Sequence, residues 1–452
     1  MLKFSESQKS FLGLLFTLAL PISLQNLLTC SMSVIDILMV GQLHETAIAA
    51  VGIANQFVFM FIVIQYGIHS GVSIFTAQYW GKKEMGRIKH LSGMGILVGL
   101  SVAGLFSYVA LVLPDNLMSL FSKDEAVIRL GTGYLRIVGV SFAFSAVIFS
   151  FMSNLRSMGF VKVPMVCSMV AVTLNIILNY ILIFGKFGFP ALGVTGAAIA
   201  TCTAKIVEGL VMAGIIYGKR YPLAATLKEM FSFDRSFFTR VLATCWPVFL
   251  NELFWVTGIS LYKLVYARIG TESIAAVNIV ATIEEFMFIP FFGIFHGGSI
   301  MIGNSIGAGR EQTAYAYGKF LLASQLVMAM AAGALMILSR EFVLSFYNIS
   351  PATYENAYYL MLVSGLVLWT KTTNFTNIVS VLRGGGDTRF GFFLDLTGVW
   401  CIGVPMAFFA AFYLDLPVYW VMALVAVEEL FKLGVGIPRF FSRKWIRNLV
   451  ET

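Results

Sequence analysis

The stretch from Ala47 to Thr76 reads AIAAVGIANQFVFMFIVIQYGIHSGVSIFT and contains no lysine, arginine, aspartate or glutamate. An apolar run of this length can cross a bilayer as a helix, because about 20 helical residues cover the hydrocarbon core. We therefore expect a transmembrane helix here. Similar runs recur from end to end of the 452 residues, so we expect the membrane to decide the fold.

The composition predicts an integral membrane protein with no sizeable soluble domain. Hydrophobic residues make up 58% of the chain and charged residues only 12%, about half the charged fraction of soluble domains. The apolar run from about Phe11 is too long for a cleavable signal, so we expect the first helix to direct its own insertion. All five cysteines lie in apolar runs without a CxxC motif, which favours buried thiols.

Glycine, proline and charged residues divide the chain into about 12 apolar segments. The segments span approximately residues 11–37, 47–76, 91–113, 131–153, 164–184, 192–217, 241–266, 273–302, 315–338, 357–382, 390–413 and 418–438. We expect an N-lobe of residues 1–217, a cytoplasmic linker of residues 218–240 and a C-lobe of residues 241–452. We expect the basic tail around Trp445 to act as an interfacial anchor.

The two halves of the chain repeat each other. A shift of 226 residues, half the chain length, places Pro21 on Pro247. One residue more places LRSMG, from Leu155, on LRGGG, from Leu382. Six helices per half is an even number, so both halves insert the same way up, as a parallel repeat. We predict an all-α membrane protein of 12 helices in two six-helix lobes, V-shaped with a central cleft suited to alternating access.

Basic residues indicate the orientation. If both termini are cytoplasmic, 21 of the 31 lysine and arginine residues lie on the inner side. The outer connections hold only Lys123, Arg129, Lys186, Arg268 and Arg340. The net charge of +8 thus reflects membrane topology, and we expect lipid contacts but no nucleic acid. We expect a multi-pass monomer with both termini in the cytoplasm.

Polar residues in the first half gather at one predicted depth. A buried ionisable group costs about 2.5–3.5 kcal/mol on insertion scales, so it faces the protein interior and is a functional candidate. Asp36 lies five residues before Gly41, about 8 Å below the outer end of the first helix. Asn175 and Asn179 share one face of the fifth helix, being four residues apart. Thr201 of the sixth helix reaches a similar depth.

These residues form a candidate site for a coupling cation. A nearby carbonyl, which we take to be that of Ala197, joins the oxygens of Asp36, Asn175, Asn179 and Thr201. Hard oxygen ligands suit Na⁺, and the same carboxylate can instead carry a proton. The alternative is that the aspartate and the asparagines only hold helices together.

A second polar set lies near the middle of the helices of the C-lobe. It comprises Glu252, Glu284, Glu285, Lys371, Glu428 and Glu429. Several carboxylates with few lysines create a negative cavity, which attracts organic cations or binds protons. Neighbouring residues on a helix point about 100° apart, so one member of each glutamate pair can serve structure. The alternative is a closed network that only joins helices, supported by Glu428 and Lys432 at i,i+4.

Signatures of other chemistries are missing from the sequence. There is no Walker motif, no cluster of metal ligands and no nucleophile triad. We therefore expect neither an enzyme nor an ATP-driven pump, and no cofactor beyond a coupling ion, H⁺ or Na⁺. Pro21, Pro247, Pro290 and Pro405 interrupt helices and are candidate kinks. Pro21 is the candidate bend of the first helix.

Five stretches resemble the multidrug and toxic compound extrusion (MATE) family. They read LPISLQNLLTCSMSVIDILMVGQL, AIAAVGIANQ, AQYWGKKE, GFPALGVTGAAIATCTAK and VLRGGGDTRFGFFLDLTGVWCIGVP. The likeness covers nearly the whole chain and keeps its order. It implies 12 helices in two lobes and cation-coupled export of mainly cationic amphiphiles. With the short loops, it also implies a bacterial inner membrane.

The resemblance also carries over site residues. The family's N-lobe cation site pairs an aspartate on helix 1 with polar residues on helices 5 and 6. Asp36, Asn175, Asn179 and Thr201 match these positions. Some members have a second aspartate where this chain has Asn179, so a single titratable group is left. Glu252 matches the glutamate of a C-lobe site, whereas helix 10 offers no acid here.

The sequence therefore predicts an antiporter that exports organic, mainly cationic, drugs or toxic metabolites by alternating access. We expect cation binding at Asp36 from outside to bend or repack the first helix, and so to release substrate outward. A flippase for a lipid-linked oligosaccharide, from the same superfamily, is the first alternative, and it would favour a cationic cavity. A membrane enzyme or receptor is the second, and the parallel repeat argues against it.

Overall fold

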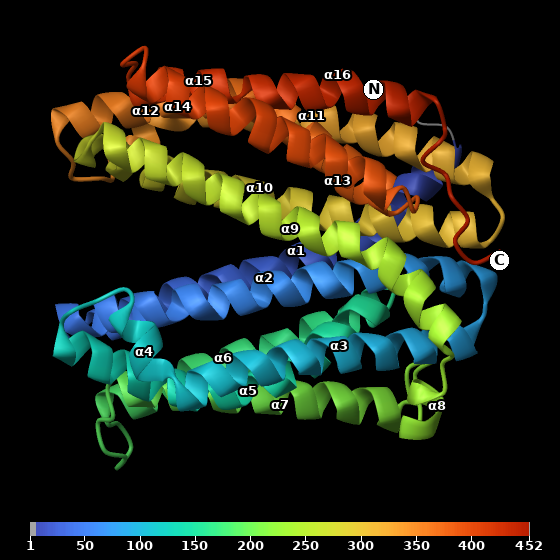
Figure 1. Cartoon of the computed structure of the whole chain (residues 1–452), viewed down its shortest axis with the longest axis horizontal. Coiled ribbons are helices and arrows are strands. Elements are labelled where there is room, and N and C mark those ends of the chain that lie inside the picture. Colours follow the sequence, from blue (N-terminus) through green and yellow to red (C-terminus); the bar gives the residue numbers. More distant parts are fainter. Residues whose placement is uncertain (1–5, 452) are drawn as a thin grey trace. The chain divides into compact units, whose positions relative to one another are not determined.

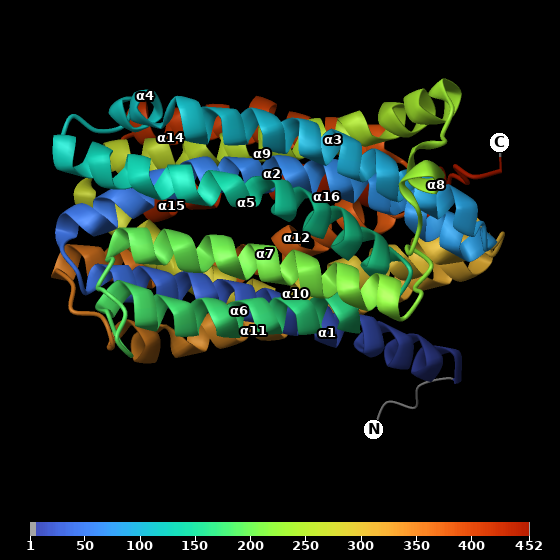
Figure 2. The same cartoon turned by 90° about the horizontal axis from the view of Figure 1, so that it is seen from below.

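The computed structural model describes residues 6–451, with side chains from residue 11 onward, and this part of the chain contains helices but no strand. It forms two compact units, each drawn in Figures 1 and 2. The N-terminal unit is Leu24–Cys245, and the C-terminal unit combines Met1–Ser23 with Trp246–Thr452. Helix α1 (Glu6–Gly41) therefore contributes to both units. The predicted lobe boundaries stay a prediction.

The N-terminal unit holds the second part of α1, the complete helices up to α8 and the start of α9. The complete helices are α2 (Glu45–Lys82), α3 (Met85–Val112), α4 (Pro114–Ser119), α5 (Glu125–Ser157), α6 (Lys162–Phe184), α7 (Val194–Gly218) and α8 (Leu227–Phe231). Five of these are long, and α4 and α8 are short connections. Helices α2, α3 and α5 pack on one another, and α7 packs on α5 and α6 (Figure 2).

The C-terminal unit holds the remaining helices, two of which include π-helical segments. Its helices are α9 (Arg235–Ile269), α10 (Thr271–Gly307), α11 (Glu311–Leu344), α12 (Pro351–Phe375) with η1 (Thr376–Arg383), α13 (Thr388–Leu396) with η2 (Thr397–Gly403) and α14 (Val404–Phe412), α15 (Val418–Val425) and α16 (Val427–Phe441). Helices α10, α11 and α12 pack together, and α12 also contacts α15 and α16 (Figure 1).

The 12 predicted apolar segments are confirmed as helices. Ten helical stretches of the described chain are long and apolar enough to cross a membrane. One of these is Thr388–Phe412, in which α13, η2 and α14 follow one another without a break. The two further segments are α12 with η1 and α15 with α16. The chain is therefore an all-α, multi-pass membrane protein.

Aromatic rings and small residues form the interiors of the two units. In the N-terminal unit the buried rings of Phe61 and Phe142 lie 4.5 Å apart, centroid to centroid. In the C-terminal unit, a side chain on Gly333 of α11 would overlap the backbone carbonyl of Gly365 on α12. Such pairs of small residues let two membrane helices approach closely. Helix contacts of this kind hold the polar side chains at fixed depths inside each unit.

Helix α1 passes through Pro21 without ending, although proline removes one helical hydrogen bond. The division between the two compact units falls just beyond it, between Ser23 and Leu24. Within the C-terminal unit the first part of α1 packs closely on α10. A side chain on Gly293 would overlap the carbonyl of Ala19, and the hydroxyl of Ser23 donates to the carbonyl of Pro290 at 3.3 Å.

The predicted linker carries a short helix with a capping box. The side chain of Thr226 accepts from the backbone of Glu229, whose side chain accepts from the backbone of Thr226. Lys89 of α3 forms an ion pair with Glu229 at 2.8 Å. The hydrogen bonds from Lys89 and Thr226 lower the pKa of the exposed Glu229 carboxyl to about 2. The linker is thus docked on α3.

The C-terminal tail corrects one expectation. Trp445 is fully buried, so it is not an interfacial anchor. Its ring lies where a side chain on Gly385 would stand, and its indole nitrogen donates to the carbonyl of Phe440 at 2.9 Å. The buried carboxylate of Asp387 forms ion pairs with Arg439 at 2.8 Å and with Arg447 at 2.7 Å. Gly385 and Gly386 of the GGGD loop have no room for a side chain because the tail folds back onto them.

Candidate functional site

The candidate cation site of the N-terminal unit forms a chain of hydrogen bonds. The side-chain amide nitrogen of Asn179, on α6, donates to Asp36 Oδ1 of α1 at 2.5 Å and to Asn175 Oδ1 at 3.1 Å. The amide nitrogen of Asn175 donates to Thr201 Oγ1, on α7, at 3.4 Å. The structure therefore brings together four of the predicted residues from three helices. Ala197 is buried one turn before Thr201 on α7.

Burial gives this site one open side. Asn175 and Asn179 are 0% and 1% exposed, whereas Asp36 and Thr201 are half-buried. Although it is buried, Asn179 Oδ1 has no hydrogen-bond donor among the described residues. A buried carbonyl oxygen without a donor is costly, and a bound cation would satisfy it. Amide, hydroxyl and carboxylate oxygens suit Na⁺, and the carboxylate can equally bind a proton.

Two more side chains border this site that the sequence did not single out. Tyr134 of α5 is buried and lies within electrostatic range of Asp36. Its hydroxyl also donates to Asn55 Oδ1, on α2, at 3.3 Å. The site thus draws on five helices of the N-terminal unit, although it contains a single carboxylate.

A second polar chain crosses the same unit at a different level of α1. Arg156, at the end of α5, donates to Gln25 Oε1 at 2.6 Å. The amide nitrogen of Gln25 donates to Ser168 Oγ at 2.7 Å, and the Ser168 hydroxyl donates to Glu208 Oε1 at 2.8 Å. Lys205 completes the chain with an ion pair to Glu208 at 2.8 Å. It holds the turn of α1 that follows Pro21.

The C-terminal unit contains an ionic cluster centred on Lys432, which is 3% exposed. The Lys432 ammonium lies 2.9 Å from Asp395 Oδ1, 3.6 Å from Glu428 Oε1 and 3.8 Å from Glu429 Oε1. Two of these carboxylates were predicted site residues. Asp395 was not, and it lies on α13, whereas the other three side chains lie on α16. We call these four side chains the Lys432 cluster.

Neutral donors complete the Lys432 cluster. The hydroxyl of Tyr262, on α9, donates to Glu428 Oε2 at 2.6 Å. The amide nitrogen of Asn374, on α12, donates to Glu429 Oε2 at 2.7 Å. The amide nitrogen of Asn251, on α9, donates to Asp395 Oδ2 at 3.0 Å. Each carboxylate therefore has one neutral donor and a share of one ammonium.

The other predicted residues of this set lie in separate pairs. Glu252 Oε1 accepts from the guanidinium of Arg383 at 2.6 Å, and Arg383 is buried at the end of η1. Glu284 Oε1 lies 3.2 Å from the ammonium of Lys371. Glu285 is exposed on α10. Of the five predicted acids and one lysine, Glu252 lies in one pair, Glu284 and Lys371 form another, and Glu428 and Glu429 belong to the Lys432 cluster, while Glu285 lies on the exposed surface of α10.

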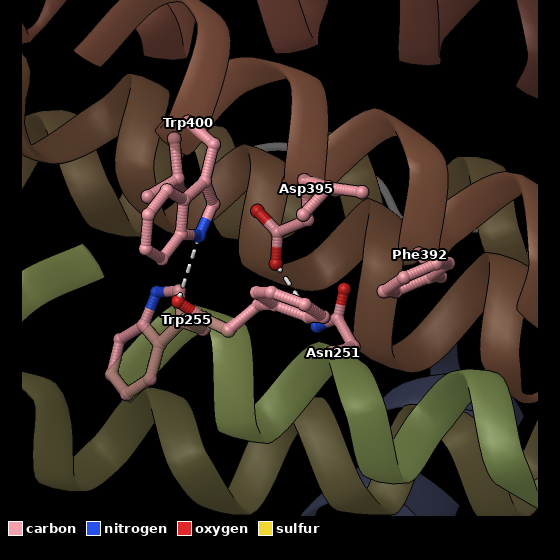
Figure 3. A pocket seen from close by; sticks show the side chains of 8 residues that line it. Asn251, Trp255, Phe392, Asp395 and Trp400 are labelled. Carbon is pink, nitrogen blue, oxygen red and sulfur yellow. Dashed lines mark hydrogen bonds between the residues drawn. The ribbon is translucent and has the colours of Figure 1, made fainter. Parts of the chain in front are cut away.

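A small pocket opens beside Asp395. It is too tight for a water molecule and is lined by Asn251, Phe254, Trp255, Phe392, Asp395, Leu396, Val399 and Trp400. Figure 3 shows the two tryptophans and Phe392 around the hydrogen-bonded side chains of Asn251 and Asp395. The indole nitrogen of Trp400 is already bound to the carbonyl of Phe254 at 3.1 Å. The pocket therefore presents mainly aromatic carbon.

Comparison with known proteins places this arrangement in a family. The MatE family model matches residues 21–181 and 247–409, which is more than half of the chain. The chain belongs to the MATE family of transporters. The two matched segments coincide with the two halves of the predicted repeat, and the recognition made from the sequence is confirmed.

Curated and solved relatives agree with this assignment. The uncharacterized transporter YisQ of Bacillus subtilis is 27% identical over 96% of this chain and 95% of its own. The multidrug resistance protein MdtK of Yersinia pestis is 27% identical over 87% and 86%. A solved outward-facing multidrug resistance MATE family transporter of the MOP superfamily matches with a TM-score of 0.87, at 18% identity, over 100% of both chains. The MATE fold of 12 helices in two bundles is confirmed.

The prediction from the sequence missed several charged residues inside the helices of this MATE protein. Asp395, Glu208 and Lys205 lie within predicted helices, just as Asp36 does, so the rule that singled out Asp36 applies to them equally. Arg383 directly follows the predicted segment 357–382, where a connection is expected, but it is 5% exposed and pairs with Glu252. The two residues are 131 positions apart, so no local pattern in the sequence pairs them.

Proposed function

We propose that this MATE protein is a cation-coupled antiporter that exports organic cations, with Asp36 as the coupling carboxylate. The hydrogen bond from Asn179 to Asp36, inside a site with a single carboxylate, carries the proposal. Asp36 is half-buried, so its carboxylate is open on one side, while Asn175 and Asn179 are wholly buried. Cation binding at Asp36 neutralises the one carboxylate that α1 contributes to this site.

The gradient does work because the two states of the transporter bind the cation with different affinity. Asp36 and Pro21 lie on the same continuous helix, α1. Proline leaves the carbonyl of Thr17 without its helical donor, which makes a bend easier at this turn. We therefore assign to Pro21 the bend that follows cation loading at Asp36. The hydrogen bonds of Gln25 with Arg156 and Ser168 keep the adjacent turn of α1 bound to α5 and α6.

The substrate class follows from acids and aromatic rings. The curated relative MdtK is a multidrug resistance protein, and two tryptophans line the pocket beside Asp395. Aromatic faces attract organic cations. Sites for drug-sized ligands have volumes of about 300–1,000 Å³, whereas the space beside Asp395 is too tight for a water molecule. We therefore assign to its aromatic rim a contact with the substrate, and we place the main binding space elsewhere.

The coupling ion is H⁺ or Na⁺, and no further cofactor is needed. The bias of basic residues supports a protein of the cell inner membrane with both termini in the cytoplasm. We propose that the transporter works as a monomer among membrane lipids. Transport without covalent chemistry fits membership of a transporter family.

The test is efflux of two matched dyes from vesicles containing the purified transporter. One dye is a flat aromatic cation of the ethidium type, and the other is a neutral dye of similar size. The proposal expects efflux of the cation under an imposed ion gradient and little efflux of the neutral dye. Equal export of both dyes would refute the cation preference. Movement of a lipid-linked oligosaccharide without dye efflux would instead support the flippase.

A further inference from the structure

The Lys432 cluster has an excess of acid that coupling through Asp36 leaves unexplained. Three carboxylates share one ammonium, and all three lie within 3.8 Å of it. The adjoining charges cancel in pairs, Lys371 with Glu284 and Arg383 with Glu252. If every carboxyl group were ionised, the cluster would hold two uncompensated negative charges.

Such an excess is costly at this degree of burial. Glu428 and Asp395 are 5% and 9% exposed, and they lie on helices that cross the membrane. The penalty for burying an unpaired ion is several kcal/mol, even after the surroundings relax. A buried carboxylate without an adequate counter-charge becomes neutral instead. The cluster must therefore bind a further positive charge.

The oxygen partners favour a proton over a metal ion. Each of the six carboxylate oxygens already has a partner: Lys432 for one oxygen of each group, and Asn251, Tyr262 or Asn374 for the other. A metal ion would need several of these oxygens to give up their donors. A proton adds to an oxygen that is already in place. The ammonium lies closest to Asp395, so the two glutamates are the less compensated groups.

An unsatisfied amide supplies a second, independent observation. Asn374 is 3% exposed and donates to Glu429 Oε2, but its own Oδ1 has no donor among the described residues. A carboxylate offers no hydrogen to this oxygen, whereas a protonated carboxyl group does. One more hydrogen at Glu429 would allow the amide oxygen to be satisfied as well.

We propose that the Glu428–Glu429 pair holds one proton and forms a second proton-binding site, separate from Asp36. Protonation transfers H⁺ from water to one carboxylate oxygen and changes the charge of the pair by one unit. The titratable or charged groups that face the pair are Tyr262 and Tyr266 on α9, Lys371 on α12, Asp395 on α13 and Lys432 on α16. Further out, Glu284 on α10 pairs with Lys371, and Arg383 on η1, which pairs with Glu252 on α9, acts on Asp395.

The backbone around the cluster is built to accommodate it. A side chain on Gly398 would overlap Lys432, and one on Gly403 would overlap the Tyr262 hydroxyl and the Glu428 carboxylate. Both glycines lie on η2, and π-helical segments inside α-helices frequently mark functional sites. When the pair gains or loses its proton, the Lys432 ammonium can change its nearest carboxylate and move against η2. The site is thus placed to affect the packing of the C-terminal unit.

The inference extends the proposed function and rests on it only for the use of the second proton in transport. Binding itself is tested by infrared titration of the full-length purified protein, which reports the carbonyl stretch that only a protonated carboxyl group gives. In Asp36→Asn, we expect one such band at neutral pH, which disappears at alkaline pH. Replacing both Glu428→Gln and Glu429→Gln in that background is expected to remove it.

Two further variants keep the test decisive if the double replacement does not fold. Tyr262→Phe deletes the donor to Glu428 Oε2 at nearly constant volume, so the band is expected to shift in frequency. Glu285→Gln, at the exposed neighbour of Glu284, is the matched control and should leave the band unchanged. The absence of a titrating band in Asp36→Asn, or a band indifferent to Tyr262→Phe, would overturn the inference. Efflux by Asp36→Asn at the parental rate would instead count against the proposed function alone.

Discussion

Arg383 Nη1 lies 2.6 Å from Glu252 Oε1, and the internal repeat explains why this contact exists. The LRSMG and LRGGG motifs place Arg156 and Arg383 at equivalent positions. In the N-terminal unit Arg156 binds Gln25, also at 2.6 Å and also across 131 positions. In both units, therefore, the end of the fourth membrane-spanning helix is bound to the first. Arg156 of α5 binds the neutral amide of Gln25 on α1, and Arg383 of η1 binds the carboxylate of Glu252 on α9.

The repeat extends to the next helix in the same register. Ser168 and Asp395 each stand 13 positions after the leucine of the repeated motif. Both accept a hydrogen bond from an amide of the unit's first helix, Gln25 or Asn251. A lysine of the unit's last helix is nearby in each case. Lys205 is linked to Ser168 through Glu208, whereas Lys432 pairs directly with Asp395. The acidic partners therefore differ between the two units, whereas the positions that make these contacts are the same.

This comparison predicts that Glu252 supports structure rather than binding substrate. Glu252→Ala leaves the buried guanidinium of Arg383 without its partner, which costs about 3–5 kcal/mol. Glu252→Gln reproduces the amide of the other unit and should cost only about 1 kcal/mol. Thermal unfolding in detergent should rank the variants in this order, with efflux retained in Glu252→Gln. A Glu252→Gln protein that is stable but does not transport would contradict the assignment.

The hydrogen bond to Asp36 predicts a graded effect in the cation site. Asn179→Ala removes the donor to the carboxylate, and hydrogen bonds to charged groups contribute about 1.5–3 kcal/mol. We expect the efflux rate under a fixed gradient to fall by about tenfold or more. Asn175→Ala is the matched control, because Asn175 contacts Asp36 only through Asn179, and it should reduce the rate less. The reverse order would show that the contact does not matter.

The close packing at η2 predicts a strong position effect among glycines. Gly403→Ala places a methyl group on the Tyr262 hydroxyl and the Glu428 carboxylate, so it should lower the unfolding temperature markedly. Gly434→Ala meets nothing within 4 Å on α16 and should raise stability by up to about 1 kcal/mol. Equal effects of the two changes, measured by thermal unfolding, would contradict the described packing.

The buried tail predicts that Trp445 stabilises the C-terminal unit. Truncation of a buried tryptophan to alanine typically costs about 3–5 kcal/mol. Trp445→Ala should therefore destabilise the protein and free the tail for proteolysis. Trp420→Ala is the control, since Trp420 is 56% exposed on α15 and should matter little to stability. A tail that is cut equally fast in the parent protein would show that it does not fold back.

Much of the fold could be predicted from the sequence, because hydrophobic length is a local property. The 12 segments followed from apolar runs and punctuation alone. The grouping of Asp36, Asn175, Asn179 and Thr201 also followed, because helical rise converts position in the chain into depth. Depth limits which polar residues can meet, and the structure brings these four together.

The partners inside the C-terminal unit could not be predicted in the same way. Depth does not say which face of a helix meets which neighbour, so Glu252 was grouped with acids although it pairs with Arg383. The π-helical segments change the direction in which the side chains after them point, and no local sequence pattern predicted these segments. Trp445 was misread because tryptophan beside basic residues also suits an interface, and only the glycine loop opposite explains its burial.

The most direct test of the account is dye efflux from loaded vesicles under an imposed pH gradient or an imposed Na⁺ gradient, for the parent protein and for Asp36→Asn. The account predicts that one of the two gradients drives efflux in the parent, and that this efflux is lost in Asp36→Asn at equal amounts of folded protein. Efflux by Asp36→Asn at the parental rate would contradict the central claim.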